Sequence, residues 1–268
     1  MVLSENKLKK ISISISIVFY NSSEKDVKKV LSTLKKLNSL SKFTFSFFLI
    51  DNASTPKLHL DLENLQMQNV YIKRLEVNNG FGAGHNAVLG DLNSDFHIIM
   101  NPDIDIEDLD GFVKAVYYMQ EHKNIVMLSP LVRNETDGDI QYLNRKLPTV
   151  FDLFIRFLGP NIFPKRHASF TKKQDGYDHI QPAENATGSF MIIRTYNLKK
   201  VQGFDTSYFM YFEDTDLTRR ISDEGKVIFF PYLTVIHGWR RDNHTLKGLK
   251  PMIISMVKYF NKWGWKWI

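Results

Sequence analysis

The sequence predicts an α/β fold in which a mostly parallel central sheet is flanked by helices. Two observations support this class: strand-like and helix-like segments alternate through the N-terminal part, and polar residues gather directly after the predicted strands. The chain has 268 residues, of which 43% are hydrophobic, and this suits one large domain with a substantial core. Ligands of open α/β sheets bind outside the carboxyl ends of the strands, so we expect the polar loops to converge on one site.

The first strand, helix and second strand are predicted over residues 11–50. Isoleucines alternate with serines over residues 11–17, the period-two pattern of a strand. Ser22 or Ser23 can cap the helix that follows, which we expect to end near Leu37. A densely apolar second strand over 43–50 ends at Asp51 and Asn52.

Two further strands are expected at residues 70–75 and 96–100. Between them, glycines in residues 80–84 predict a tight turn before a short helix over about 85–92. The fourth strand ends abruptly at Asn101-Pro102-Asp103.

Carboxylates cluster after this fourth strand. A strand-end carboxylate such as Asp103 is a suitable ligand for a divalent cation that also bridges substrate phosphates. The next carboxylates are predicted to lie at the N-terminus of a helix running to about Glu121, where they meet the positive end of its dipole: Asp105, Glu107, Asp108 and Asp110.

Several common sites are absent from the sequence. It has no cysteine, which excludes disulfides, thiolate metal sites and a cysteine nucleophile. It has neither a Gly-x-Gly-x-x-Gly turn after the first predicted strand nor a Gly-Lys-Ser or Gly-Lys-Thr, so a dinucleotide fold and a P-loop are excluded. The net charge of +6 suits an anionic ligand or surface without choosing one, and the scattered basic residues disfavour nucleic acid.

The chain ends carry localisation signals of different strength. No apolar stretch approaches the ~18–20 residues that span a bilayer, and residues 1–10 lack a signal-peptide core, so we expect the protein on the cytoplasmic side. Residues 246–268 interleave tryptophans and lysines and predict an amphipathic helix suited to a membrane interface. Packing against the remaining chain explains its apolar face equally well.

A further apolar helix is expected over 151–158. It lies in a middle region that could contact an acceptor or simply pack against the domain.

An acidic cluster follows an aromatic run near residue 213. Glu213, Asp214 and Asp216 come directly after four aromatics and a methionine at residues 208–212. Close like charges and apolar surroundings raise a carboxyl pKa, which prepares a general base. The same carboxylates also suit the first turn of a helix.

Eight short segments of the sequence together resemble the glycosyltransferase family 2 enzymes of the GT-A fold, especially their bacterial rhamnosyltransferase-like branch. The resemblance spans residues 11–240. It rests on segments that occur in family order: 18–21, 49–54, 79–86, 100–103, 186–191, 203–205, 209–217 and 235–237.

The resemblance implies a pyrimidine nucleotide-sugar site at the carboxyl ends of the strands. Asp51 resembles the carboxylate that accepts a hydrogen bond from the base, and the main chain of residues 19–21 borders it. Residues 82–86 resemble the segment that lines the nucleotide and sugar. The residues implied for donor binding are Phe19, Tyr20, Asn21, Asp51, Asn52, Gly82, Gly84, Asn86, Asn101 and Arg240.

It also implies a divalent cation, Mg²⁺ or Mn²⁺. Asp103 resembles the surviving carboxylate of the Asp-x-Asp metal motif, and His237 resembles a further metal or phosphate ligand. Asn101 stands at the first position of that motif, and a neutral ligand there holds a cation less strongly.

Asp214 resembles the catalytic base of the family, with Glu213 beside it as an orienting partner or acceptor contact. On the acceptor side the resemblance implies Gly188, Ser189 and Tyr211. Asp216 is expected to be structural.

The resemblance implies an inverting transferase for L-rhamnose from dTDP-L-rhamnose, acting on a lipid-linked or other surface-polysaccharide precursor. Residues 1–245 would form the GT-A domain, with its nucleotide part over about 11–105 and its acceptor part over about 106–245. Residues 246–268 would be a C-terminal segment that is able to contact membrane. The alternatives are another nucleotide sugar (UDP- or GDP-linked), a metal-dependent nucleotidyltransferase, and a non-catalytic module for anionic glycan or nucleic acid.

Overall fold

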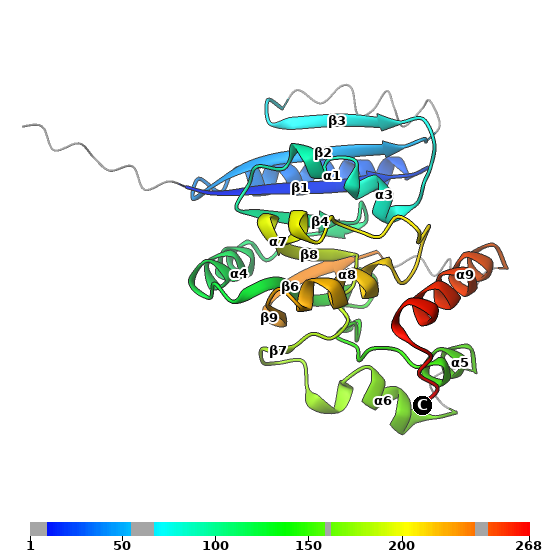
Figure 1. The fold of residues 1–268 in the computed structure, drawn as a ribbon. Coiled ribbons are helices and arrows are strands. Elements are labelled where there is room, and N and C mark those ends of the chain that lie inside the picture. Colours follow the sequence, from blue (N-terminus) through cyan, green and yellow to red (C-terminus); the bar gives the residue numbers. More distant parts are fainter. Residues whose placement is uncertain (1–9, 55–66, 159–161, 239–245) are drawn as a thin grey trace, which may run out of the picture.

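The computed structural model describes residues 10–54, 67–158, 162–238 and 246–268, and a single mixed β-sheet forms its centre (Figure 1). Over these residues the sheet has nine strands in the order β3-β2-β1-β4-β8-β6-β9-β5, with β7 paired to β9 beside this path. Helices cover both faces of the sheet, and the predicted α/β class is confirmed.

The first half of the sheet is parallel and contains the strands predicted from the sequence. Strand β1 lies between β2 and β4, and β3 follows β2 at the edge. Their bounds are β1 Ile11–Phe19, β2 Phe43–Asn52, β3 Val70–Leu75 and β4 Phe96–Met100. Because β1, β2 and β4 run in the same direction, the polar residues after them lie at one edge of the sheet.

The second half of the sheet mixes both directions. Strand β8 is antiparallel to β4 and β6, whereas β6 and β9 form a long parallel ladder. The parallel ladders together contain more residues than the antiparallel ones, so most of the residue pairs in the whole sheet are parallel. Strands β5 and β7 each add a short antiparallel pair to β9. The bounds are β5 Ile104–Asp105, β6 Ile125–Asn134, β7 Gln181–Pro182, β8 Phe190–Arg194 and β9 Lys226–His237.

Two hydrophobic cores lie on opposite faces of the sheet. Helices α1 (Glu24–Asn38) and α4 (Leu109–Glu121) cover one face and bury the isoleucines of β1. Ser23 caps α1 as predicted, since its hydroxyl accepts the Asp26 N–H at 3.2 Å and the Asp26 carboxylate accepts the Ser23 N–H at 3.0 Å. The other face carries α3 Phe81–Asn86, η1 Leu89–Asp91, α7 Thr195–Lys200 and α8 Glu213–Ser222.

The remaining helices gather beyond the second half of the sheet, where α5, α9 and the C-terminus lie close together (Figure 1). The inner face of α9 buries Tyr259 and Phe260 against Leu153 of α5. The last residues return to α5, whose Val150 N–H donates to the Lys266 carbonyl at 2.9 Å. The predicted C-terminal helix is thus present and its inner face is packed. The bounds are α5 Val150–Leu158, α6 Pro164–Phe170, η2 Lys173–Asp175 and α9 Leu246–Trp263.

Two predicted local structures are wrong. In place of a turn at 80–84 and one helix over about 85–92, the chain forms α3, which starts at Phe81 and contains Gly82 and Gly84, and then the separate short helix η1. Asp105 lies in β5 and forms an ion pair with Lys36 at 3.1 Å, so it does not belong to the start of α4. Asp108 does cap α4, as its carboxylate accepts the Gly111 N–H at 2.7 Å.

A buried network of hydrogen bonds joins β1, β4 and α3 on one face of the sheet. His97 on β4 is hydrogen-bonded to Ser14 through Nδ1 at 2.7 Å and to Ser16 through Nε2 at 2.8 Å. Ser16 also contacts His85 Nδ1 at 2.7 Å. Burial lowers the pKa of both His85 and His97 to about 3, and for His85 the nearby His97 adds to the effect. Both imidazoles are therefore neutral, and the serines that alternate along β1 serve as their partners.

Candidate active site

A cleft of about 500 Å³ lies at the carboxyl ends of β1, β2 and β4. Loops after these three strands form one side, as the sequence predicted. The loop before β8 and the start of α8 form the other side. The predicted residues that line it are Tyr20, Asn52, Asn101, Asp103, Gly188, Ser189, Tyr211, Glu213, Asp214 and His237.

A strained turn presents the acidic cluster to this cleft. Tyr211 and Phe212 have φ angles of 70° and 67°, in the left-handed region that non-glycine residues rarely adopt. Helix α8 then begins at Glu213, so Glu213 and Asp214 occupy its first turn. The turn docks on the opposite side of the cleft, where the Phe81 N–H donates to the Phe209 carbonyl at 3.0 Å.

Two backbone N–H groups fix the side chain of Asp214. Its Oδ2 accepts the Gly188 N–H at 3.0 Å, and its Oδ1 accepts the Thr215 N–H at 2.7 Å. A Cβ on residue 188 would lie 3.3 Å from the Asp214 Cβ and 3.2 Å from the Phe81 ring, so a larger residue there would press on both side chains. The carboxylate is fixed in orientation and reaches the cleft.

Glu213 has a different environment from its neighbour. It is 6% exposed, and its Oε2 has no hydrogen-bond partner among the described residues. Burial, reinforced by the charge of Asp214, raises the pKa of Glu213 well above its usual value. The pair thus places a Glu213 whose burial favours the protonated form beside Asp214, whose oxygens accept two backbone N–H groups, and this arrangement suits a base beside a hydrogen-bond donor.

Asp103 and His237 lie next to each other in the cleft. His237 Nε2 lies 3.4 Å from Asp103 Oδ1, and Gln141 Oε1 orients the ring at 3.0 Å from Nδ1. Burial opposes ionisation of Asp103, but the hydrogen bond and charge of His237 outweigh it and lower the pKa of that carboxyl. Among the described residues no group of three His, Cys, Asp or Glu side chains could hold a metal. A two-residue donor set fits a cation that takes its other ligands from diphosphate oxygens and water.

The family model for glycosyl transferase family 2 matches residues 14–201 of this chain. The chain belongs to this family. Rhamnosyltransferase WbbL of Escherichia coli (strain K12) is 29% identical over 191 residues, which are 67% of this chain and 69% of that protein. The N-acetylglucosaminyl-diphospho-decaprenol L-rhamnosyltransferase of Mycobacterium tuberculosis (strain ATCC 25618 / H37Rv) is 26% identical over 226 residues, 76% of this chain and 70% of that one.

Solved structures support the GT-A fold of this family 2 glycosyltransferase. The mannosyltransferase PcManGT from Pyrobaculum calidifontis, in complex with GDP-Man and Mn²⁺, has a TM-score of 0.59 at 14% identity, covering 88% of this chain and 59% of that one. GalNAc-T7 with UDP, GalNAc and Mn²⁺ has a TM-score of 0.64 at 15% identity, covering 95% and 48%. The chain thus spans only about half to three fifths of the length of these two structures.

Other donor-side residues predicted in this family 2 chain do not line the cleft. Phe19 is fully buried, and the carboxylate of Asp51, also buried, accepts the Ser54 N–H at 2.8 Å. The Asn21 N–H donates to Ser54 Oγ at 3.0 Å. These contacts tie the end of β1 to the end of β2. Arg240 lies outside the described residues.

The α3 residues predicted to line the nucleotide make contacts that hold α3 in place, and their role toward a nucleotide stays a prediction. A Cβ on Gly82 would lie 2.6 Å from the Phe204 Cβ, and one on Gly84 would lie 2.8 Å from a Val18 methyl group. The Asn86 amide donates to the Phe204 carbonyl at 2.7 Å and accepts the Phe204 N–H at 2.9 Å. Both glycines allow α3 to approach its neighbours closely.

Sequence reasoning missed several residues that line the cleft. Gly80 has a φ of 100°, and a Cβ there would lie 2.1 Å from the Phe209 carbonyl oxygen, so only glycine permits the acidic turn to dock. Asn78 accepts the Gly80 N–H at 2.9 Å, and Thr187 precedes Gly188. The Asn78-Asn79-Gly80 triplet was the available signal, since such residues favour positive φ.

Asp216 supports the site from behind. It is fully buried and receives hydrogen bonds from Arg220 Nε at 2.7 Å and Trp263 Nε1 at 2.8 Å, with Lys262 Nζ also at 2.8 Å. Trp263 and Lys262 belong to α9. The structural role predicted for Asp216 is therefore to fasten the C-terminal helix beneath the acidic turn.

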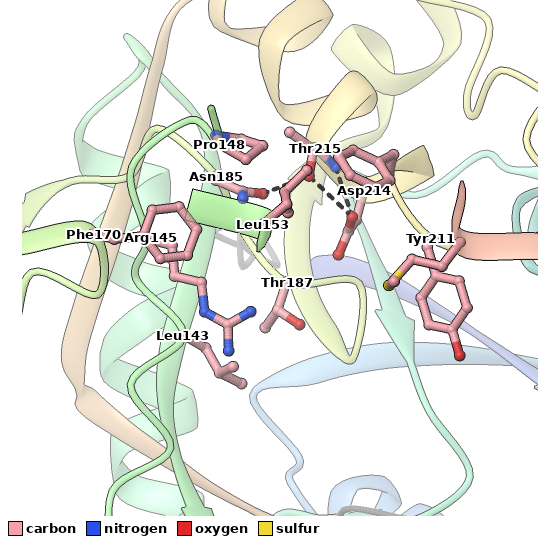
Figure 2. A pocket seen from close by; sticks show the side chains of 12 residues that line it. Leu143, Arg145, Pro148, Leu153, Phe170, Asn185, Thr187, Tyr211, Asp214 and Thr215 are labelled. Atoms are coloured by element: carbon pink, nitrogen blue, oxygen red, sulfur yellow. Dashed lines mark hydrogen bonds between the residues drawn. The ribbon is translucent and has the colours of Figure 1, made fainter. Parts of the chain in front are cut away.

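A second, smaller cavity of about 140 Å³ also contains Asp214 (Figure 2). Thr187, Tyr211 and Asp214 border both spaces. Leu153 of α5 and Met252 of α9 form apolar walls. Asp214 thus stands where the large cleft and the small cavity meet.

Proposed function

We propose that this glycosyltransferase is an inverting enzyme that transfers L-rhamnose from dTDP-L-rhamnose to a lipid-linked glycan precursor. The observation that carries the proposal is Asp214, a fixed carboxylate at the junction of a large donor-sized cleft and a smaller cavity. The relatives named as rhamnosyltransferases support the choice of sugar, and the diphospho-decaprenol in one of those names supports the choice of acceptor.

In this proposal one displacement completes the transfer. Asp214 accepts the proton of an acceptor hydroxyl while that oxygen forms a bond to the anomeric carbon of the sugar. The bond from this carbon to the diphosphate oxygen breaks, and the nucleoside diphosphate leaves with the electron pair. Attack from the opposite face inverts the anomeric configuration.

The cleft provides groups that oppose the growing negative charge. Asp103 and His237 would hold the divalent cation, Mg²⁺ or Mn²⁺, which neutralises charge on the departing diphosphate. Neutral Glu213 can donate a hydrogen bond into the same space. Tyr20, Asn52 and Asn101 line the region proposed for the nucleotide.

A thermal-shift screen tests the nucleotide and the cation together. We expect dTDP with Mn²⁺ or Mg²⁺ to raise the Tm by about 5 °C at a large excess over Kd, because ligand binding to the native state stabilises it by about 2.7 kcal/mol at 100 times Kd. Asp103→Asn should lose the increment that depends on the cation and keep the increment from nucleotide alone.

UDP and GDP are the comparison ligands of this screen. Selective stabilisation by dTDP supports the proposed donor, and a stronger response to UDP or GDP would replace it. The absence of any response to all three nucleotides would contradict a nucleotide-sugar enzyme.

We further propose that the outer face of α9 contacts a membrane that carries the acceptor. Within the described residues, none of the helices has the length and apolar character needed to cross a bilayer. Ile253, Ile254 and Val257 nevertheless stand 44%, 46% and 37% exposed, between the exposed Lys250 and Lys258. An apolar stripe with basic flanks suits the interface of an anionic membrane.

Replacing this stripe is the sharper test, because removal of the whole helix would also remove Tyr259 and Phe260 and expose their buried partners Leu153, Tyr208 and Phe212. We expect Ile253→Asp with Ile254→Asp to reduce co-sedimentation with anionic liposomes several-fold, while the Tm changes little. The exposed Tyr196, on α7, provides a matched control as Tyr196→Asp. Equal liposome binding by all three proteins would refute the membrane contact.

A further inference from the structure

We propose that Arg145 binds a phosphate group of the acceptor in the small cavity beside Asp214. This inference rests on the proposed function and deepens it, because it defines which acceptors the site takes. They carry an anionic phosphate close to the hydroxyl that reacts, as a sugar attached through a diphosphate does.

Arg145 is placed by the backbone rather than by its own flexibility. The main chain of Arg145 pairs with that of Asn185 in an isolated antiparallel bridge, and the Arg145 Nε donates to the Tyr142 carbonyl at 3.3 Å. The guanidinium lies at the cavity, with its terminal nitrogens on the side of Thr187 (Figure 2). Among the described residues that line this cavity, Arg145 is the only cation.

The cavity combines two chemically distinct ends. At one end, Asp214 can take a proton from a hydroxyl, and its orientation is fixed by Gly188 and Thr215. At the other end, the planar fork of Arg145 matches two oxygens of a phosphate. An acceptor that satisfies both presents a hydroxyl and a phosphate on the same small unit.

The size and walls of the cavity further restrict which acceptors can bind. Its volume of about 140 Å³ is well below the ~300–1,000 Å³ of pockets that enclose whole drug-sized ligands. It therefore holds only the reacting end of the acceptor. Leu153, Phe170 and Met252 provide apolar surface in the same cavity, which suits the first carbons of a lipid attached to the phosphate.

The diphosphate of the donor is the competing partner for Arg145. The donor cleft contains Asp103 and His237 and is bordered by other residues, whereas Arg145 does not line it. Binding of the donor should therefore be independent of Arg145, and this separates the two explanations.

The test compares two acceptors that share one sugar: a short-chain prenyl-diphospho-sugar and the neutral octyl glycoside. For Arg145→Gln we expect the KM of the diphosphate acceptor to rise about tenfold or more, while the KM of the octyl glycoside changes less than about twofold. Arg145→Lys should recover part of the loss, since it keeps the charge but not the fork. The Kd of dTDP should not change.

Three outcomes would overturn the assignment. They are an equal effect on both acceptors, no effect on either, and a weakened Kd for dTDP with an unchanged acceptor KM. If the wild-type protein transfers to neither acceptor, the proposed function fails, and calorimetric binding of the prenyl-diphospho-sugar decides the role of Arg145. Weaker binding by Arg145→Gln than by wild type would still support it, and equal or absent binding would refute it.

Discussion

Replacement of Asp214 by Asn is expected to lower kcat by about 10²–10⁴-fold, the range typical of general-base catalysis. The amide is nearly isosteric with the carboxylate but cannot accept the proton of the acceptor hydroxyl. Because Asp214 lies at the border of the donor cleft rather than among the residues proposed for the nucleotide, the Kd of dTDP should stay within about threefold. Steady-state kinetics and calorimetry measure the two quantities on the same preparation.

The neighbouring residue supplies a matched control. Glu213 is buried with a raised pKa and is already neutral, so Glu213→Gln keeps its charge state and most of its shape. We expect this variant to retain at least about a tenth of the wild-type kcat. If Glu213→Gln is inactive and Asp214→Asn is active, the two roles are exchanged. If neither variant affects transfer, the base lies elsewhere.

The elements predicted correctly are those with a strong local pattern. Strand β1 alternates isoleucine with serine, β2 is densely apolar, and α1 begins with a serine cap, so short-range physics determines them. Helix α3 was missed because Gly82 and Gly84 disfavour a helix locally, whereas packing against Phe204 and Val18 requires their small size. Strands β5 and β7 have two residues each and carry no periodic signal.

The residues of the candidate site likewise fall into those with a local sequence signal and those without one. Strand-end polarity and the acidic run located Asp103, Glu213 and Asp214, because those signals lie within short stretches of sequence. Arg145 was not recognised, since its pairing with Asn185 is a long-range contact inside a region without a repeating pattern. The raised pKa of Glu213 depends on its burial, which neighbours in the sequence do not reveal.

The buried histidines predict that mild acid destabilises this fold. His85 and His97 have pKa values of about 3 in the folded state and about 6.5 when unfolded. Below pH 6.5 the unfolded chain binds protons that the folded chain does not, so stability falls as the pH drops from 6.5 toward 3. Each histidine contributes about 1.4 kcal/mol per pH unit in that window, and the pair therefore costs about 3 kcal/mol between pH 7.5 and 5.5.

Glu213 acts in the opposite direction over the same range. Its raised pKa keeps it protonated in the folded state, so its contribution to stability grows as the pH falls. The two effects separate in a Glu213→Gln background, where urea unfolding should show the whole loss of about 3 kcal/mol. Adding His97→Gln should halve that loss, whereas His122→Gln, at an exposed histidine on the surface, should leave it intact. A loss that is not reduced by His97→Gln would show that the titration of His97 does not cause the acid destabilisation.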